Sequence, residues 1–497
     1  MRTERRCGIL LHPTSLPGPG GIGSLGPEAR RFADFLHAAG QSIWQVLPLG
    51  YTSFGNSPYM CYSAFAGNPL LINLERLVEE GDLKETDLPD NLSPHRVDYR
   101  AVEEYKFPSL RKAASAFFGK GKTWRMEEFW HFCDTTPWLH DFALFMALKE
   151  RFAGKAADWS QWPDALARRA PESLEVASRE LGAVIGVHKY FQWQFFRQWR
   201  ETRDYANERG VAVFGDIPIF IAYDSADVWT NPRLFLLDQR GRPVVVAGVP
   251  PDYFSKTGQL WGNPLYDWEE MARDGYAWWI ERVRASLGLY DLLRIDHFRG
   301  FAGYWEVRAG EKTAMNGQWK TGPGESFFHA LESALGRLPL VAEDLGVITP
   351  DVEALRDRFS LPGMKILQFA FGSGPDNPYL PYNHVSNSVV YTGTHDNDTT
   401  AGWFSSLSGR ERKNVLNYLG TSGEDIVKDL ARTAMSSVAD TVILPLQDVL
   451  GLGSDSRMNL PGKAGGNWSW RVSRDMFSRK TERWLRDMTG IYGRLRQ

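Results

Sequence analysis

Cysteine is scarce in this sequence. Cys7, Cys61 and Cys133 are the only three among 497 residues, and none stands at the short spacing of a metal-binding pair. An odd number of scattered thiols builds neither the disulfide framework of a small secreted domain nor a zinc site. We therefore expect buried or idle thiols, no metal, no cofactor and no redox chemistry.

An excess of charge of either sign is also lacking. Lys and Arg number 57 against 60 Asp and Glu, which leaves a net charge of −3. No block of like charges is long enough to form a tail that binds nucleic acid. The balance speaks against a nucleic-acid partner and favours small neutral ligands.

Long apolar runs are absent as well. Nowhere do eighteen apolar residues follow one another, and the apolar stretch 7–11 stops at His12, too short for the core of a signal peptide. We expect no membrane association and a cytoplasmic location. With 43% hydrophobic residues, the chain has enough apolar material for a large globular core.

Aromatic residues are what the sequence has in unusual number, with 19 Trp, 18 Tyr and 28 Phe. Most aromatic side chains fill protein cores, but their flat apolar faces also stack on the C–H faces of sugar rings. Composition alone does not separate these two roles.

Eight short runs rich in β-branched and aliphatic residues recur along the whole chain, each followed by a helical or loop segment. Strands that alternate with helices form parallel sheets, and eight such units close most simply into a (β/α)₈ TIM barrel. We therefore predict an α/β fold with one catalytic domain over residues 1–497. The runs are 8–11, 43–47, 211–214, 292–295, 340–342, 365–369, 389–391 and 442–444.

Two connections between these runs are too long for a simple crossover. Residues 51–210, between the second and third runs, predict an inserted and mostly helical subdomain. Residues 217–268, between the third and fourth, are rich in Pro, Gly and aromatics and predict an inserted region of extended substrate loops. Both insertions should frame the mouth of the active site. Residues 402–440 are typical of helices, so we expect no separate C-terminal domain.

Polar residues follow the predicted strands with unusual frequency. In a barrel of this kind the reacting groups lie where the strands end. One such residue by itself usually caps the next helix. So many polar residues at the same end of the barrel, however, predict an active site there. They are His12, Asp216, Arg294, Asp296, His297, Glu343, Asp344, Gln368, His395, Asp396, Asp398, Gln447 and Asp448.

Arg294 and Asp296 are the most informative of these candidates. They alternate with Leu293 and Ile295, so both should point into the barrel. A guanidinium beside a carboxylate favours its ionised form, which a nucleophile attacking an anomeric carbon requires. Glu343, after an apolar strand, is the natural second carboxyl, protonated to serve a departing sugar oxygen. From these residues alone, an ion pair that merely closes the barrel remains the alternative.

Two other kinds of site fit parts of the sequence. Residues 21–26 match the dinucleotide pattern G-x-G-x-x-G, but three prolines separate them from the preceding strand, and the next strand lacks the acidic residue that would bind a ribose. His12, Asp216, His395 and Asp396 are ligand types for a metal hydrolase, but they show no known ligand spacing.

Eight longer segments carry a resemblance that spans nearly the whole chain. They are HPTSLPGPGGIGSLG from His12, SPYMCYSAFAGNPLLI from Ser57, FGDIPIF from Phe214, PPDYFSKTGQLWGNPLY from Pro250, RIDHFRGF from Arg294, AEDLG from Ala342, THDNDT from Thr394 and RMNLPGKAGGNWSWR from Arg457. In this order they resemble the 4-alpha-glucanotransferases of glycoside hydrolase family 77, also called amylomaltases or disproportionating enzymes.

The resemblance implies a retaining transfer of a 1,4-α-D-glucan segment to the 4-hydroxyl of glucose or of another glucan. Asp296 would be the nucleophile, Glu343 the general acid and then base, and Asp396 the carboxylate that grips the reacting glucose. Retention implies that the first two carboxyls lie about 5 to 5.5 Å apart. The implied partners are maltooligosaccharides and other 1,4-α-glucans. A retaining α-glucan hydrolase of the α-amylase type is the alternative.

The same resemblance implies contacts between further residues and the glucan. The sequence departs from the family pattern in substrate-facing loops, at Asn56, Met60, Cys61, Lys256, Leu460 and Lys463. The resemblance therefore does not predict which length of glucan chain is preferred. Tyr253 and Trp261 would belong to a mobile flap. The implied substrate-binding residues are Arg294, His395, Tyr59, Asp216, Tyr253, Trp261 and Asn467.

Overall fold

The computed structural model describes residues 5–89, 92–251, 255–463 and 465–496. Within them, eight parallel strands form one sheet in the order β10-β11-β12-β1-β2-β3-β6-β9. The ends of this order meet where the backbone N–H of Ala342 donates to the carbonyl of Pro362 at 2.9 Å. The sheet therefore closes into a (β/α)₈ barrel. Its strands are β1 (Arg6–Leu10), β2 (Ile43–Gln45), β3 (Ala212–Pro218), β6 (Leu292–Asp296), β9 (Leu340–Ala342), β10 (Gly363–Ile366), β11 (Ser388–Tyr391) and β12 (Thr441–Pro445).

All eight predicted barrel strands are present, with small differences at their ends. β3 continues to Pro218 because that residue still pairs in register with Asp296 of β6. β10 is shorter than predicted, since Leu367–Phe369 form a 3₁₀ turn. Gln368 in this turn donates from Nε2 to the carbonyl of Asp398 at 2.9 Å. It therefore braces the loop after β11.

Helices surround the barrel and shield its strands. α1 begins at Pro27, where the missing N–H of proline costs nothing, and it buries Phe32 and Leu36. The stretch 402–440 is helical as predicted. The helices of this layer are α1 (Pro27–Ala38), α11 (Ala277–Leu289), α12 (Glu325–Leu335), α13 (Pro350–Arg358), α14 (Thr400–Ser406), α15 (Gly409–Leu419), α16 (Ile426–Ser436), α17 (Leu446–Val449) and α18 (Arg479–Ile491).

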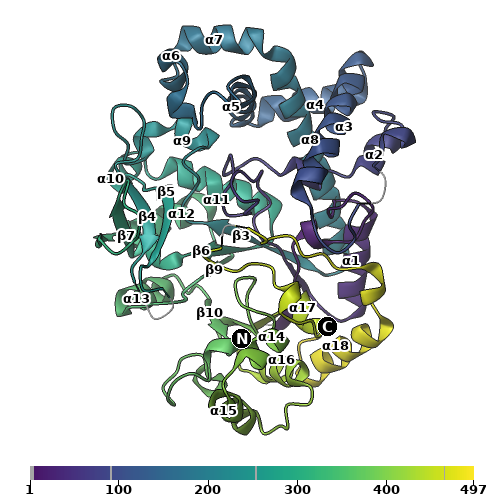
Figure 1. Cartoon of the computed structure of the whole chain (residues 1–497), viewed down its shortest axis with the longest axis vertical. Helices are drawn as coiled ribbons and strands as arrows, with labels where there is room; N and C mark the ends of the chain where they lie inside the picture. Colours follow the sequence, from purple (N-terminus) through teal and green to yellow (C-terminus); the bar gives the residue numbers. More distant parts are fainter. Residues whose placement is uncertain (1–4, 90–91, 252–254, 464, 497) are drawn as a thin grey trace.

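A group of helices fills the connection between β2 and β3, and Figure 1 shows several of them at one end of the molecule. α8 is the longest and buries Trp193, Phe195 and Trp199. It contacts α1 and β3 of the barrel as well as α3, α4 and α5. The group comprises α2 (Leu74–Glu79), α3 (Tyr99–Gly119), α4 (Trp124–Thr135), α5 (Leu139–Arg151), α6 (Asp164–Ala167), α7 (Pro171–Glu180) and α8 (Gly182–Glu208).

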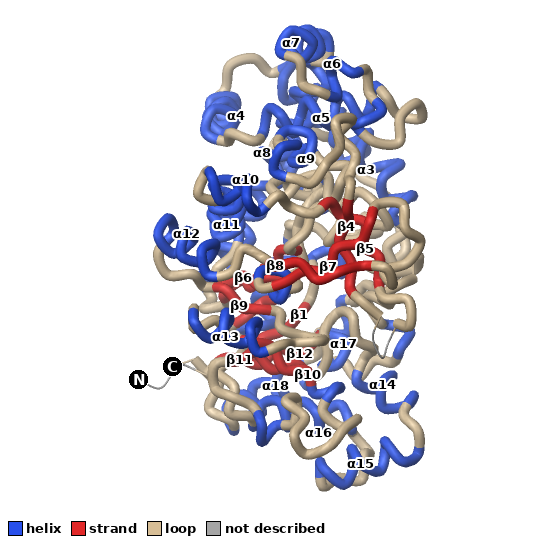
Figure 2. Tube along the Cα trace, turned by 90° about the vertical axis from the view of Figure 1, so that its left-hand side faces the viewer, coloured by secondary structure: helices blue, strands red, loops and turns tan. Residues whose placement is uncertain are grey.

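A second, antiparallel sheet lies next to β6 and β9 (Figure 2) and has the order β5-β4-β7-β8. β4 (Val245–Val249) and β5 (Gln259–Pro264) come from the region that we predicted as extended loops, together with α9 (Ala226–Thr230); α10 (Trp268–Arg273) follows. β7 (Gly303–Arg308) and β8 (Gly317–Thr321) form a hairpin that the sequence analysis did not predict. We keep 51–210 and 217–268 as the proposed limits of the two insertions.

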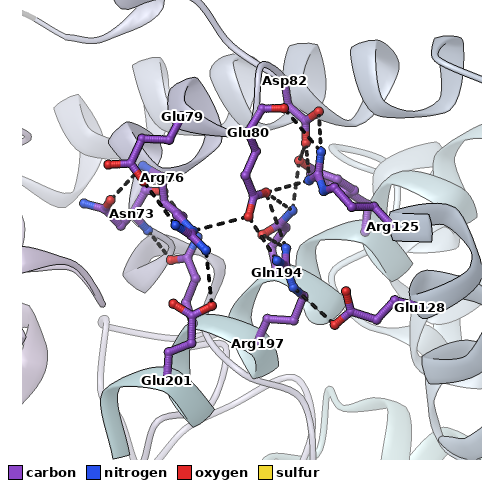
Figure 3. A network of polar contacts seen from close by, with 12 residues as sticks. Asn73, Arg76, Glu79, Glu80, Asp82, Arg125, Glu128, Gln194, Arg197 and Glu201 are labelled. Carbon is purple, nitrogen blue, oxygen red and sulfur yellow. Dashed lines mark hydrogen bonds and ion pairs between the residues drawn. The ribbon is translucent and has the colours of Figure 1, made fainter. Parts of the chain in front are cut away.

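A network of buried charges ties the helices of the β2–β3 connection together (Figure 3). Asp82, whose side chain is fully buried, accepts from Nη1 and Nη2 of Arg125 on α4 at 2.9 and 2.6 Å. Glu80 bonds the same guanidinium at 2.5 Å and Arg197 of α8 at 3.0 Å. The segment after α2 is thereby fixed to α4 and α8. In the part of the chain that the structure describes, every helix is too short or too polar to cross a membrane.

Candidate active site

Asp296 ends β6, and its carboxylate is oriented by Arg294 two residues earlier. Nη2 of Arg294 donates to Oδ1 of Asp296 at 2.7 Å, and Nη1 donates to Oδ2 of Asp216 at 2.5 Å. Asp216 lies opposite Arg294 in the β3–β6 register and also accepts from the hydroxyl of Tyr59 at 2.7 Å. The predicted pairing of Arg294 with Asp296 is confirmed. About a third of the Asp296 side chain, 30%, stays exposed.

Glu343 follows β9, the neighbour of β6, so its carboxyl lies at the same end of the barrel as Asp296. Two backbone N–H groups hold it: that of His297 donates to Oε2 at 2.6 Å and that of Leu345 to Oε1 at 2.9 Å. His297 has a φ of 53°, in the left-handed region that non-glycine residues seldom adopt. The turn after Asp296 thus both contains this left-handed residue and supplies the N–H that meets Glu343.

The surroundings of these two carboxyls shift their pKa values by different amounts. Burial raises the pKa of Asp296 to about 6; Asp216 and Asp396 add to the rise, and Arg294 opposes it. Burial raises the pKa of Glu343 to about 8, with the charge of Asp296 adding and with Arg294 and the two backbone N–H groups opposing. Arg294 thus favours ionised Asp296 as predicted, but burial outweighs it. Both pKa values are raised, and that of Glu343 is raised further, so Glu343 keeps its proton to higher pH than Asp296 does.

Asp396 follows β11 and is held by a loop that comes much later in the chain. Nδ2 of Asn459 donates to its Oδ1 at 2.6 Å, and Nη2 of Arg457 donates to its backbone carbonyl at 2.5 Å. Nε2 of His395 lies 3.4 Å from the same Oδ1. Asn459 and Arg457 belong to the segment from Arg457 that resembles the family, but neither could be selected as a site residue from the sequence, because only the folded chain brings them to Asp396.

His395 forms an aromatic wall beside these carboxylates. Its ring stacks on Tyr59 with centroids 5.3 Å apart and planes at 15°, and both rings approach Trp468. Nε2 of His395 lies 3.0 Å from the Tyr59 oxygen. Since the Tyr59 proton is donated to Asp216, His395 is the donor in this contact. Burial lowers the pKa of His395, which favours the neutral ring. Trp468 is a further wall residue that the sequence analysis missed.

Of the remaining predicted residues, Trp261 and Asn467 lie outside the eight barrel strands. The Trp261 ring in β5 meets the His297 ring edge to face, with centroids 4.8 Å apart at 84°. The Asn467 side chain bonds the backbone of its own loop, accepting from the N–H of Leu460 at 3.0 Å and donating to the carbonyl of Lys463 at 2.8 Å. Tyr253 lies outside the described residues.

The glycines that match a dinucleotide motif have a packing role. A Cβ added to Gly23 would lie 1.9 Å from the carbonyl oxygen of Pro13, and one added to Gly26 would lie 2.4 Å from Nδ2 of Asn73. These contacts leave no room for a side chain at either position. Close packing therefore explains why glycine is needed at these two positions, and a dinucleotide-binding role is not required to explain it.

A (β/α)₈ barrel whose neighbouring strand ends bring together two carboxyls with unequally raised pKa values, beside a wall of aromatic rings, is typical of enzymes that act on glycosidic bonds. A family model described as 4-alpha-glucanotransferase matches residues 11–476. The chain belongs to this family.

Individual relatives agree with the family match. The chain is 54% identical to a 4-alpha-glucanotransferase of Synechocystis sp. over 99% of this chain and 98% of the relative. It is 49% identical to that of Thermus thermophilus over 95% of both chains. The solved amylomaltase of Streptococcus agalactiae, in complex with acarbose, is 41% identical and superposes with a TM-score of 0.96 over 99% of this chain and 100% of that chain. The function is therefore 4-alpha-glucan transfer, and the hydrolase alternative is not favoured.

Proposed function

We propose that the chain transfers glucan segments by a retaining double displacement, with Asp296 as nucleophile and Glu343 as general acid and base. The carrying observation is the difference between two carboxyls at neighbouring strand ends, the pKa of one raised to about 6 and that of the other to about 8. At pH 7 this pair supplies the ionised nucleophile and the protonated acid that glycoside cleavage requires.

In the first half of the reaction, a carboxylate oxygen of Asp296 forms a bond to the anomeric carbon. The bond from that carbon to the leaving 4-oxygen breaks, and Glu343 gives its proton to this oxygen. The products are a covalent glucosyl-enzyme and a shortened glucan. In the second half, Glu343 takes the proton of an acceptor 4-hydroxyl, whose oxygen displaces Asp296 from the anomeric carbon. Two displacements retain the α configuration.

Asp396 and His395 would bind hydroxyls of the reacting glucose. Asn459 fixes one oxygen of Asp396, which leaves the other for the sugar. Hydrogen bonds to ring hydroxyls strengthen as the oxocarbenium-like state forms. Arg294 neutralises part of the charge of Asp216 and Asp296 and so keeps the nucleophile aimed.

Transfer requires that water stay away from the glucosyl-enzyme until an acceptor arrives. The loop that carries Met458 and Trp468 lies over Tyr59 and His395, and Trp261 covers His297. We propose that these aromatic side chains, together with Tyr253, form the cover. We further propose maltooligosaccharides as substrates, acarbose as a ligand of the same cleft and the cytoplasm as the location.

Incubation with maltotriose alone tests the proposal. Transfer predicts glucose together with maltooligosaccharides longer than three units, with little gain in reducing ends. Steady accumulation of reducing ends would instead identify a hydrolase.

Two variants test the assigned roles. Asp296→Ala should abolish turnover and leave no covalent intermediate. Glu343→Gln should slow both halves of the reaction by orders of magnitude while maltotriose still binds, because the amide of Gln retains the shape of the side chain but acts neither as an acid nor as a base near neutral pH. Near-normal rates in either variant would contradict the assignment.

A further inference from the structure

Trp319 in β8 is an exposed indole whose orientation is fixed from one side. The side chain is 42% exposed. The guanidinium carbon of Arg299 lies 4.0 Å from the centre of its ring, and the Trp305 ring meets it edge to face at 5.2 Å. Trp305 is itself held, since its Nε1 donates to the carbonyl of Ala314 at 2.8 Å. Trp319 is therefore held by Arg299 and Trp305 and still remains partly exposed to solvent.

Arg299 connects this indole to the catalytic loops. It is buried and lies three residues after Asp296. Its Nη1 donates to the carbonyl of Val347, four residues after Glu343, and its Nε donates to that of Gly303 at 3.4 Å. Trp319 thus packs on Arg299, and Arg299 connects the turn after Asp296 to the loop after Glu343.

The polar neighbours of Trp319 in β8 are already paired elsewhere. Gln318 donates from Nε2 to Oε1 of Glu306 at 2.8 Å, and Nζ of Lys320 lies 3.7 Å from the same oxygen. Because side chains alternate along a strand, these residues lie on the opposite face from Trp319. Between Trp305 and Trp319 the hairpin therefore presents an apolar, aromatic face.

We propose that Trp319 is a glucan-binding subsite that stacks on a glucose unit of the acceptor chain, beyond the unit next to the reacting bond. The proposal rests on the glucan transfer proposed above. Glu343 acts first on the 4-oxygen of the leaving chain and later on the 4-oxygen of the acceptor. Sugars bound next to the loop of Glu343 therefore belong to the leaving chain in the first half of the reaction and to the acceptor in the second. Aromatic faces stack on the C–H faces of sugars, and an indole held in place beforehand loses little conformational freedom on binding.

Acceptor length is the variable that tests this subsite. With amylose as donor, we would measure the acceptor KM for glucose and for maltotetraose in the wild-type protein, in Trp319→Ala and in Trp319→Tyr. On this proposal glucose, which occupies only the position next to the reacting bond, makes no contact with Trp319. Trp124→Ala is the control, because Trp124 is also an exposed indole, at 68%, but belongs to α4 at the helical end of the molecule (Figure 1).

Trp319→Ala should raise the KM for maltotetraose about tenfold, which corresponds to one lost stacking contact. The KM for glucose should change less than about twofold by the same reasoning, since no contact is lost. Trp319→Tyr retains a flat ring and should restore most of the affinity for maltotetraose. Trp124→Ala should match the wild-type protein with both acceptors.

Two outcomes would overturn the subsite. If Trp319 only covers Arg299, Trp319→Ala would lower kcat alike with both acceptors and would move the alkaline limb of the pH profile, because the loop of Glu343 would shift. Unchanged KM values for both acceptors would also exclude it. Absence of transfer by the wild-type protein would instead contradict the proposed function itself.

Discussion

The backbone N–H of His297 donates to Oε2 of Glu343 at 2.6 Å. His297 directly follows Asp296, so one turn of chain both ends the strand of the proposed nucleophile and holds the proposed acid. His297 itself is in the left-handed conformation, with φ at 53°, so the chain turns sharply directly after this N–H. The positions of the two carboxyls are therefore coupled through the backbone.

The activity should depend on pH through both carboxyls. Below about pH 6 Asp296 becomes protonated and no longer attacks, and above about pH 8 Glu343 loses the proton that it must give. We expect a bell-shaped profile of kcat/KM for maltotriose with limbs near these values. In Glu343→Gln the alkaline limb should disappear from the residual activity. Its persistence there would assign that limb to another group.

Substitution at His297 should change the alkaline limb by altering the backbone. Glycine adopts the left-handed region freely, whereas a β-branched residue there costs about 1–2 kcal/mol. His297→Val should therefore lose the N–H contact more than His297→Gly does. Because this contact favours the ionised form of Glu343, its loss should move the alkaline limb to higher pH and lower kcat/KM. Equal pH profiles in the two variants would show that the backbone conformation of residue 297 does not determine the pKa of Glu343.

Asn459 should matter more for catalysis than Asn467. Asn459→Ala removes the donor 2.6 Å from Oδ1 of Asp396, and a hydrogen bond to a charged group contributes about 1.5–3 kcal/mol. We expect kcat/KM for maltotriose to fall about 10- to 100-fold by that figure. Asn467→Ala, which removes only bonds within its loop, serves as the comparison. A larger loss in Asn467→Ala would give Asn467 the direct contact instead.

The barrel and the candidate carboxyls could be predicted because their signals are local. Each barrel strand is a short apolar run, and the residue that follows it faces the open end whatever the rest of the chain does. Strand-end position places Asp296, Glu343 and Asp396 among the polar candidates, and the family resemblance then separates their roles from those of the other candidates.

Features that depend on distant pairing could not be predicted in this way. The β7–β8 hairpin consists of two short strands whose identity is set by cross-strand pairs such as Trp305 and Trp319. Asn459 meets Asp396 across 63 residues of chain. The effect of Arg294 on Asp296 had the predicted direction, but only the folded structure shows that burial outweighs it.

Arg125 offers a prediction about stability away from the proposed active site (Figure 3). Burial acts to raise the pKa of Asp82, but hydrogen bonds from Arg125, Lys120 and Tyr190 outweigh it and hold that pKa below its ordinary value. Arg125→Met leaves buried carboxylates without their main partner, which should cost about 3–5 kcal/mol of unfolding free energy at pH 7. Arg76→Met, at the more exposed side of the same network, should cost no more than about 1 kcal/mol.

The pH dependence of this loss checks its cause. A carboxyl whose pKa is lower in the folded than in the unfolded chain stabilises the fold above its unfolded pKa, and the contribution disappears as the pH falls through the folded value. The difference in unfolding temperature between the wild-type protein and Arg125→Met should therefore be largest near neutral pH and shrink on acidification. A difference that stays constant down to strongly acidic pH would mean that lost packing of the Arg125 side chain, and not its charge, destabilises the variant.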